Sequence, residues 1–317
     1  MDYETELKKR TAGVEAIIQN HLPAEEGYAK TIMSAMNYSV MAGGKRLRPL
    51  LMAETYKLFA VQDGNAPLIP QNPVLHRFMA AIELIHNYSL VHDDILDHDE
   101  YRRGKKTTHA VYGDDMGLLA GDALLNYAFE TAAGAFEAER VCEACMLLGL
   151  TSEAAYMQRI AKALQVLSKK AGIYGMIGGQ TCDVEDEGKE ITKDELDFIQ
   201  EGKTGALIEA AMLVGAILAG ASDEDLMKVE AAASGIGRAF QIRDDILDVT
   251  GDEAVLGKHV GSDEENHKVT YVTFEGLEKA EADVKSLSED AILILNSFAN
   301  TNDFLTETVQ YLTTREM

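Results

Sequence analysis

The sequence predicts an all-α protein, and three observations support this prediction. The prolines are confined to the first 73 residues: Pro23, Pro49, Pro67, Pro70 and Pro73. The rest of the chain therefore lacks the residue that most strongly disrupts a helix interior. It is rich in Ala, Leu, Glu, Lys and Met, which are good helix formers. Apolar residues also recur at spacings of three and four, as at Phe78, Ile82 and Ile85, so we expect amphipathic helices.

Local signals mark several helix starts. Pro49 stands where a first-turn proline would, at the beginning of PLLMAETYKLF. Thr192 and Glu195 form a capping-box pattern, and Ser222 and Asp225 form a similar one. Loops are expected where glycine, proline and polar residues cluster, at residues 65–73, 102–106 and 182–190.

No linker-like or low-complexity segment divides the chain, so we expect one domain over residues 1–317. The most membrane-like run is GALIEAAMLVGAILAGA at 205–221. It is short for a membrane span and contains Glu209, which favours a core helix and argues against stable membrane insertion. The amino terminus has acidic residues where a signal peptide would begin with basic ones.

The formal net charge of −24 argues against a nucleic-acid partner, because such a surface needs a basic patch. Three cysteines, Cys142, Cys145 and Cys182, suit a reducing compartment better than a disulfide framework. The single CxxC pair at 142–145 favours a buried helix over a zinc or redox site. These features predict a cytoplasmic protein.

The sequence DDILD occurs twice, at 93–97 and at 244–248. On a helix the first and last aspartates of each motif lie one turn apart on the same face. Both motifs follow apolar helical segments, where the negative end of the helix dipole disfavours further acids unless a cation is present. Clusters of carboxylate oxygens are suited to Mg²⁺, which is commonly bound by one or two carboxylates together with substrate phosphates. Two such clusters would hold a polyphosphate between them.

Three segments contain basic residues that could also contact a polyphosphate. GGKRLRP at 43–49 puts bases beside two glycines at an apparent helix start, which is a natural anion site. RRGKK at 102–106 follows the first acidic motif closely. KTG at 203–205 places a lysine in an otherwise apolar helix, where an unpaired charge is costly.

This ordered set of motifs resembles the all-trans polyprenyl diphosphate synthases, the family of farnesyl and geranylgeranyl diphosphate synthases. The resemblance is carried, in order, by GGKRLRP, IHNYSLVHDDILDHDEYRRG, GDALL, GGQTCD, KTGALI, FQIRDDILDVTGD and GSDEENHKVTY. It implies a single large helical bundle with a deep central cavity, of the isoprenoid synthase type. It also implies a Mg²⁺-dependent prenyltransferase that condenses isopentenyl diphosphate with an allylic diphosphate.

The resemblance assigns a role to each matching residue. Asp93, Asp97 and Asp244 would bind about three Mg²⁺ ions per active site, with Asp94 and Asp248 in support. The allylic diphosphate and the developing cation would be contacted by Arg102, Lys203, Thr204, Gln241 and Lys258. Isopentenyl diphosphate would be held by Lys45, Arg48, His86 and Arg103. Gln180 and Asp183 would line the cavity behind the ligands, and Lys268 would close the site.

Product length depends, in this family, on bulk just before the first aspartate. Tyr88 is large and Ser89 is small, so Tyr88 would form the floor of the cavity, about 7.5 Å of helix from Asp93. This arrangement predicts a short product. We expect the product to be farnesyl diphosphate, with fifteen carbons. Geranylgeranyl diphosphate, with twenty carbons, is the alternative product.

Two alternative functions are also compatible with parts of the sequence. A terpene cyclase shares the acidic metal sites but does not need the GGKRLRP pocket for a second diphosphate. A non-catalytic partner subunit of a prenyl synthase should have lost acids from one motif, and this chain keeps all six. The resemblance further implies a homodimer.

Overall fold

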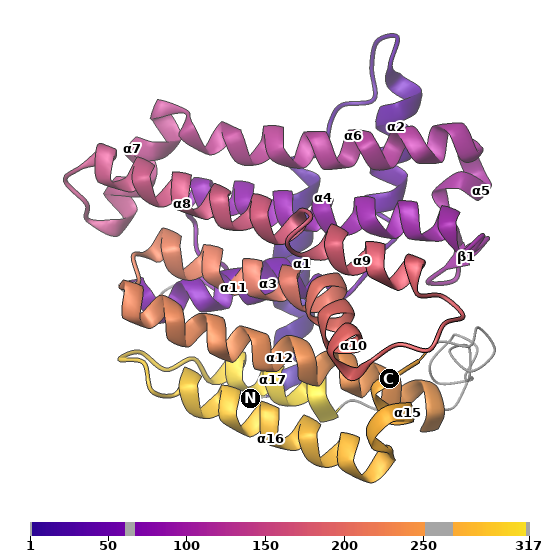
Figure 1. Ribbon diagram of the computed structural model, residues 1–317. Helices are drawn as coiled ribbons and strands as arrows, with labels where there is room; N and C mark the ends of the chain where they lie inside the picture. Colours follow the sequence, from indigo (N-terminus) through magenta and orange to yellow (C-terminus); the bar gives the residue numbers. More distant parts are fainter. Residues whose placement is uncertain (1, 61–66, 251–268, 315–317) are drawn as a thin grey trace. The chain divides into compact units, whose positions relative to one another are not determined.

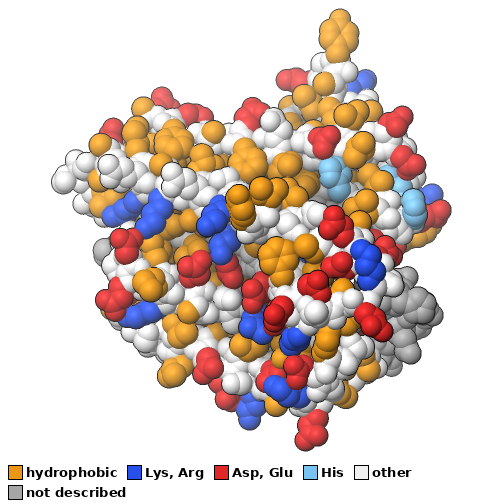
Figure 2. Space-filling view, in the orientation of Figure 1, with side chains coloured by type: hydrophobic (Ala, Val, Ile, Leu, Met, Phe, Trp, Pro, Cys, Tyr) orange, Lys and Arg blue, Asp and Glu red, His pale blue; other side chains and the backbone are white. Residues whose placement is uncertain are grey.

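Helices make up almost all the secondary structure of the residues that the structure describes, 2–60, 67–250 and 269–314. Figure 1 shows this computed structural model. The chain divides into unit 1, residues 1–53 and 61–164, and unit 2, residues 54–60 and 165–317. Asp and Glu side chains are scattered over the face seen in Figure 2, in keeping with the strongly negative net charge.

Unit 1 is built around the long helix α4, which packs against α1, α6 and α7. Its elements, with α3 and α8 running on into unit 2, are α1 (Tyr3–Gln19), α2 (Lys30–Val40), α3 (Leu47–Phe59), α4 (Pro73–Leu96), β1 (Tyr101–Arg102), β2 (Lys105–Lys106), α5 (Thr108–Tyr112), α6 (Asp114–Ala133), the 3₁₀ turn η1 (Gly134–Phe136), α7 (Ala138–Leu148) and α8 (Glu153–Ala171).

The start of α4 is fixed by its capping residues. The side chain of Asn72 accepts hydrogen bonds from the backbone N–H groups of Val74, at 2.9 Å, and Leu75, at 3.1 Å. Pro73 occupies the first helical position, where its missing N–H costs nothing. Almost every residue from Val74 to Tyr88 is buried, so α4 is the core helix of unit 1.

A small hairpin follows α4 where the sequence predicts a loop at 102–106. Strands β1 and β2 pair antiparallel, with Arg102 opposite Lys105. Arg103 and Gly104 form the turn between them, and both have positive φ values, 54° and 72°. Two such residues in succession are typical of the tight turns that join twisted antiparallel strands. The hairpin turns the chain back immediately after the first acidic motif.

Unit 2 is organised around α12, which packs against α11 and α16. Its elements are α9 (Met176–Glu185), α10 (Lys193–Gln200), the π-helix η2 (Glu201–Gly205), α11 (Ala206–Ala219), α12 (Asp223–Thr250), α15 (Tyr271–Glu275), α16 (Leu277–Leu295) and α17 (Asp303–Thr314).

The predicted helix starts of unit 2 are confirmed. Thr192 accepts from the backbone N–H of Glu195, and the Glu195 carboxylate accepts from the Thr192 backbone N–H. Ser222 accepts from the backbone N–H of Asp225 at 3.1 Å. The predicted loop at 182–190 begins later than expected, because α9 continues to Glu185.

Helix α11 is buried along its whole length, as predicted for the apolar run at 205–221. The continuous helical stretch Lys193–Ala219 is long and apolar enough to cross a membrane, but 83% of its most apolar window is buried inside the structure. Such burial is what a core helix of a globular protein requires.

Glycines allow three helical segments of unit 2 to approach one another closely. A Cβ on Gly202 of η2 would lie 2.8 Å from the Cα of Gly179 on α9. A Cβ on Gly237 of α12 would lie 2.9 Å from the Cα of Gly205 on η2. Both distances are too short for a real methyl group. The π-helix is therefore held between α9 and α12 by contacts that only glycine permits, and π-turns are frequent at functional sites.

We expect Gly202→Ala to destabilise the protein by about 1–3 kcal/mol, because the methyl group would overpack a backbone contact. The control is Gly235→Ala on α12, whose methyl would make ordinary contacts at 3.5 Å and 3.9 Å. Alanine should stabilise that helix by up to about 1 kcal/mol. Urea unfolding midpoints measure both effects, and equal midpoints for the two variants would contradict this account of the packing.

Candidate functional site

The first acidic motif lies at the C-terminal end of α4 in unit 1. The backbone N–H of Asp97 donates to the carbonyl of Asp93 at 2.9 Å, which sets the two aspartates one turn apart. Asp93 is half-buried and Asp97 is exposed. Both carboxylates are oxygen ligands of the kind Mg²⁺ prefers. No three His, Cys, Asp or Glu side chains form a ready metal-binding group in the described parts of the chain.

The middle aspartate of this motif has a different environment. Asp94 is buried, and the Nε of Arg102 donates to its carboxylate from the hairpin. Burial raises the pKa of Asp94, while the charge and hydrogen bond of Arg102 oppose that rise. A buried carboxylate needs such a partner, since an unpaired one would be strongly destabilising. Asp94 thus ties the hairpin to the end of α4.

The GGKRLRP segment contains three bases with different surroundings. Arg46 is buried and donates to Glu83 at 2.8 Å and to the carbonyl of Val40 at 2.6 Å, so it is part of the core. Lys45 is exposed. Arg48 is half-buried, and its Nε has no hydrogen-bond partner among the described residues. Burial lowers the pKa of Arg48 to about 10.

Residues from three separate segments form a cationic cluster in unit 1, which we define as Arg48, His86, Arg102 and Arg103. Burial lowers the pKa of His86 well below its ordinary value, and the positive charges of Arg48, Arg103 and Arg102 lower it further. Arg103 donates to the carbonyl of Gly43, which joins the hairpin turn to the glycine segment. A concentration of positive charge around a neutral imidazole is an environment suited to an anion.

The two predicted floor residues lie one turn before the acidic motif. Tyr88 is buried, and its ring meets the His92 ring edge-on, with centroids 5.8 Å apart. Burial raises the pKa of Tyr88 to about 12, so the phenol is neutral at pH 7. Ser89 turns back on its own helix and donates to the carbonyl of His86 at 2.8 Å. His92 fits against α6 because Gly121 has no side chain.

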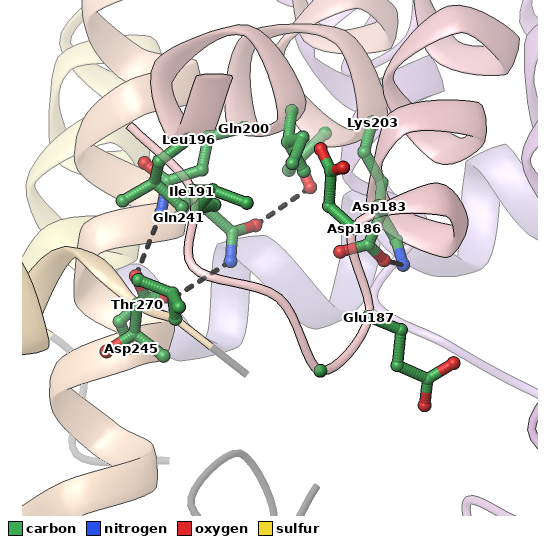
Figure 3. A pocket seen from close by; sticks show the side chains of 14 residues that line it. Asp183, Asp186, Glu187, Ile191, Leu196, Gln200, Lys203, Gln241, Asp245 and Thr270 are labelled. Atoms are coloured by element: carbon green, nitrogen blue, oxygen red, sulfur yellow. Dashed lines mark hydrogen bonds and ion pairs between the residues drawn. The ribbon is translucent and has the colours of Figure 1, made fainter. Parts of the chain in front are cut away.

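Unit 2 contains a pocket lined by α9, α10, η2, α12 and the start of α15 (Figure 3). Lys203 of η2 donates to Asp183 of α9 at 2.6 Å, so the ammonium group has a carboxylate partner inside the pocket. This contact connects the KTG and GGQTCD motifs, which lie apart in the sequence. Gln180 is half-buried on α9.

A hydrogen-bond chain crosses the same pocket. The hydroxyl of Thr204 donates to Oε1 of Gln241 at 2.8 Å, and Nε2 of Gln241 donates to Asp245 at 3.0 Å. Asp245 also accepts from Nε2 of Gln200 at 2.9 Å and from the backbone N–H of Tyr271 at 2.8 Å. The structure therefore brings together the predicted pair Thr204 and Gln241. It adds Asp245 and Gln200, which the sequence analysis did not assign to the site.

The remaining predicted residues of unit 2 differ in exposure. Asp244 is half-buried, whereas Asp248 is buried. Lys258 and Lys268 lie outside the described residues.

Known proteins resemble this chain in sequence and in fold. The sequence matches the polyprenyl synthetase family over residues 29–309. It is 40% identical to a farnesyl diphosphate synthase of Geobacillus stearothermophilus, over 86% of this chain and 84% of that one. It is 37% identical to a geranylgeranyl diphosphate synthase of Cyanophora paradoxa, over 90% and 88% of the two chains. The crystal structure of geranylgeranyl pyrophosphate synthetase from Pyrococcus horikoshii Ot3 aligns over 100% of both chains, with a TM-score of 0.80 and 29% identity.

The fold and the matches define an all-helical isoprenyl diphosphate synthase architecture. The chain belongs to the polyprenyl synthetase family. The predicted all-α fold and the family resemblance are confirmed. The prediction of a single domain over residues 1–317 and the individual site assignments stay predictions.

We expect His86 to be neutral at pH 7. Its depressed pKa means that the unfolded chain binds a proton below pH 6.5 that the folded protein does not, so this residue lowers stability as the pH falls below that value. Arg48→Met should raise the pKa of His86, because one positive charge is removed. Imidazole chemical shifts in an NMR titration measure both pKa values.

The matched control is Arg140→Met, which removes an arginine of the same unit that pairs with Glu137 at 2.9 Å. It should leave the His86 titration unchanged. A His86 pKa near 6.5 in the unaltered protein, or one insensitive to Arg48→Met, would show that the cationic cluster is not assembled as described.

Proposed function

We propose that this protein is a short-chain all-trans prenyltransferase that joins isopentenyl diphosphate to an allylic diphosphate. Family membership and the names of the relatives, farnesyl and geranylgeranyl diphosphate synthases, support a prenyltransferase enzyme. The observation that carries the proposal lies within unit 1, where Arg102 of the cationic cluster binds Asp94, the residue next to Asp93 in the acidic motif. The carboxylates of the acidic motif are suited to a diphosphate bound through metal ions, and the cationic cluster is suited to a diphosphate bound directly by basic side chains.

Magnesium ions are proposed to be held by Asp93, Asp97 and Asp244. Oxygen-only ligands and the expectation of substrate phosphates fit Mg²⁺ better than a softer metal. When bound, Mg²⁺ stabilises negative charge on the departing diphosphate. Asp94 is proposed to support the site indirectly, because its carboxylate is already engaged by Arg102. Asp248, which is buried, is proposed to act in the same supporting way.

On the allylic side, Arg102, Lys203 and Lys258 are proposed to bind the diphosphate. The ammonium group of Lys203 is paired with Asp183 at 2.6 Å, so an incoming phosphate must compete with that carboxylate. Breaking the allylic C–O bond sends its electron pair to the diphosphate and leaves an allylic cation. Thr204 and Gln241 are proposed to steady that cation. Gln180 is proposed to line the cavity, and Lys268 to close it.

Isopentenyl diphosphate is proposed to bind Lys45, Arg48, His86 and Arg103. A neutral His86 can donate one hydrogen bond to a phosphate oxygen. Burial lowers the pKa of Arg48 to about 10, which shows that its positive charge is costly without a partner, so an anionic ligand is favourable there. The double bond of this substrate then attacks the allylic cation, and a proton is lost to the released diphosphate.

Tyr88 is proposed to set the product length by blocking growth of the hydrocarbon tail. Its bulk and burial favour farnesyl diphosphate, with geranylgeranyl diphosphate as the alternative product. Neither a terpene cyclase nor a non-catalytic partner subunit gains support from the relatives, which are named as synthases.

A homodimer is proposed as the working form. Helices α6 and α7 of unit 1 expose large apolar side chains, Leu118 and Leu119 on α6 and Met146 and Leu147 on α7. Exposed apolar surface of this kind is common where subunits associate. A cytoplasmic location without membrane insertion is proposed alongside it.

The proposed function is tested by incubating the purified protein with Mg²⁺, isopentenyl diphosphate and an allylic diphosphate of five, ten or fifteen carbons. We expect products no longer than twenty carbons, measured by chromatography and mass spectrometry. Asp97→Asn should lower kcat by about 100-fold or more, because an exposed metal ligand is lost without loss of folding. The control is Glu100→Gln, an exposed acid three residues further on.

If a Tyr88→Ala variant makes products of unchanged length, the proposed role of Tyr88 in limiting product length is wrong. The proposed prenyltransferase activity would not be affected by that result. Absence of any product with all three partners, from a folded protein with Mg²⁺, would overturn the proposed activity.

A further inference from the structure

The middle aspartate of the second acidic motif is surrounded by hydrogen-bond donors. Asp245 is buried, with 4% of its surface exposed. One carboxylate oxygen accepts from Gln200 at 2.9 Å and from the backbone N–H of Tyr271 at 2.8 Å, and the other accepts from Gln241 at 3.0 Å. Figure 3 shows Gln200 of α10 approaching Gln241 and Asp245, which lie one turn apart on α12. Both carboxylate oxygens therefore act as hydrogen-bond acceptors in these three bonds.

Because the Asp245 oxygen that faces Gln241 accepts a hydrogen bond, the direction of the chain beyond it is determined. Gln241 must turn its NH₂ group towards Asp245, which leaves its Oε1 facing Thr204. Thr204 has a single hydroxyl proton and donates it to that oxygen at 2.8 Å. The remaining lone pairs of the Thr204 oxygen are therefore left for the pocket, which Thr204 and Gln241 both line.

We infer that Asp245 is a positioning residue that sets the polarity of the Gln241–Thr204 pair, so that oxygen lone pairs rather than a hydroxyl proton face the reacting carbon. The inference rests on the proposed function. When the allylic C–O bond breaks, positive charge develops on the hydrocarbon and negative charge on the departing diphosphate. Lone pairs fixed in advance stabilise that positive charge without reorganisation, whereas a hydroxyl proton would oppose it.

Asp245→Asn should reverse this polarity without removing any of the three hydrogen bonds described above. The single amide oxygen of Asn would serve the two donors on one side, the backbone N–H of Tyr271 and Nε2 of Gln200. The NH₂ group of Asn would then face Gln241. Gln241 would flip to present its oxygen to Asn and its NH₂ group to Thr204. Thr204 would accept that bond, and its own proton would turn towards the pocket.

We therefore expect Asp245→Asn to lower kcat by about 100-fold while KM for both diphosphates changes by less than about threefold. Steady-state kinetics with Mg²⁺ and both substrates measure the two parameters separately. Asp283→Asn is the matched control, because it removes a carboxylate that accepts from the hydroxyl of Tyr271 at 2.7 Å in the same unit. It should alter the melting temperature with little effect on kcat.

A compensating variant distinguishes polarity from general structural support. Gln241→Glu alone places a second carboxylate against Asp245, so its melting temperature should fall by several degrees. In the double variant Asp245→Asn, Gln241→Glu, the new carboxylate accepts from both Asn and Thr204, which restores the original direction. The melting temperature should recover, and kcat should rise at least tenfold above that of Asp245→Asn.

Two results would overturn the inference. One is a kcat of Asp245→Asn within about threefold of the unaltered enzyme, and the other is a double variant no more active and no more stable than the single ones. An unaltered protein that makes no product at all would instead contradict the proposed function. The melting temperatures of Gln241→Glu and the double variant would still decide whether Asp245 and Gln241 interact as described.

Discussion

A carboxylate that is taken out of water must be given hydrogen-bond donors, and this constraint shapes both acidic motifs. In the first motif the second aspartate is the buried member, and in the second motif Asp245 and Asp248 are both buried. Arg102 donates to Asp94, while Gln200, Gln241 and the Tyr271 backbone donate to Asp245. The buried aspartates thereby fix the hairpin on the end of α4 and fix α10 and α15 against α12. The first aspartate of each motif stays half-buried and accessible.

The basic residues of the GGKRLRP segment also have two roles, one in stabilising the fold and one proposed in binding substrate. Arg46 donates to Glu83 in the core of unit 1, while Arg48, two residues later, is half-buried and its charge lowers the pKa of His86. In this segment one base, Arg46, therefore builds the fold, and its neighbour Arg48 is the one proposed to bind substrate. The division explains how a chain with a net charge of −24 can still offer a concentrated positive site. It also explains why the motifs are dense in charge, because support and binding come from adjacent positions.

Much of this could be predicted from sequence because it depends on local pattern. The capping pair of Thr192 and Glu195 and the one-turn spacing of the outer aspartates need only neighbours within one helical turn. The burial of Asp94 was not predicted, because its partner Arg102 comes from the hairpin that follows α4. The role of Gln200 was not predicted either, because its partner is 45 residues away. The π-helix at Glu201–Gly205 was missed for a similar reason, since it depends on glycine contacts with α9 and α12.

The central claim concerns the first motif, whose outer aspartates Asp93 and Asp97 are proposed to bind metal while the second aspartate, Asp94, supports the fold. It is tested most directly by calorimetric titration of inorganic pyrophosphate into Asp93→Asn and Asp94→Asn, each with Mg²⁺ and with a chelator, alongside melting temperatures. Asp93→Asn should keep its melting temperature and lose most of the Mg²⁺-dependent binding. Asp94→Asn should melt several degrees lower and retain Mg²⁺-dependent binding. The reverse assignment of these two effects would contradict the account.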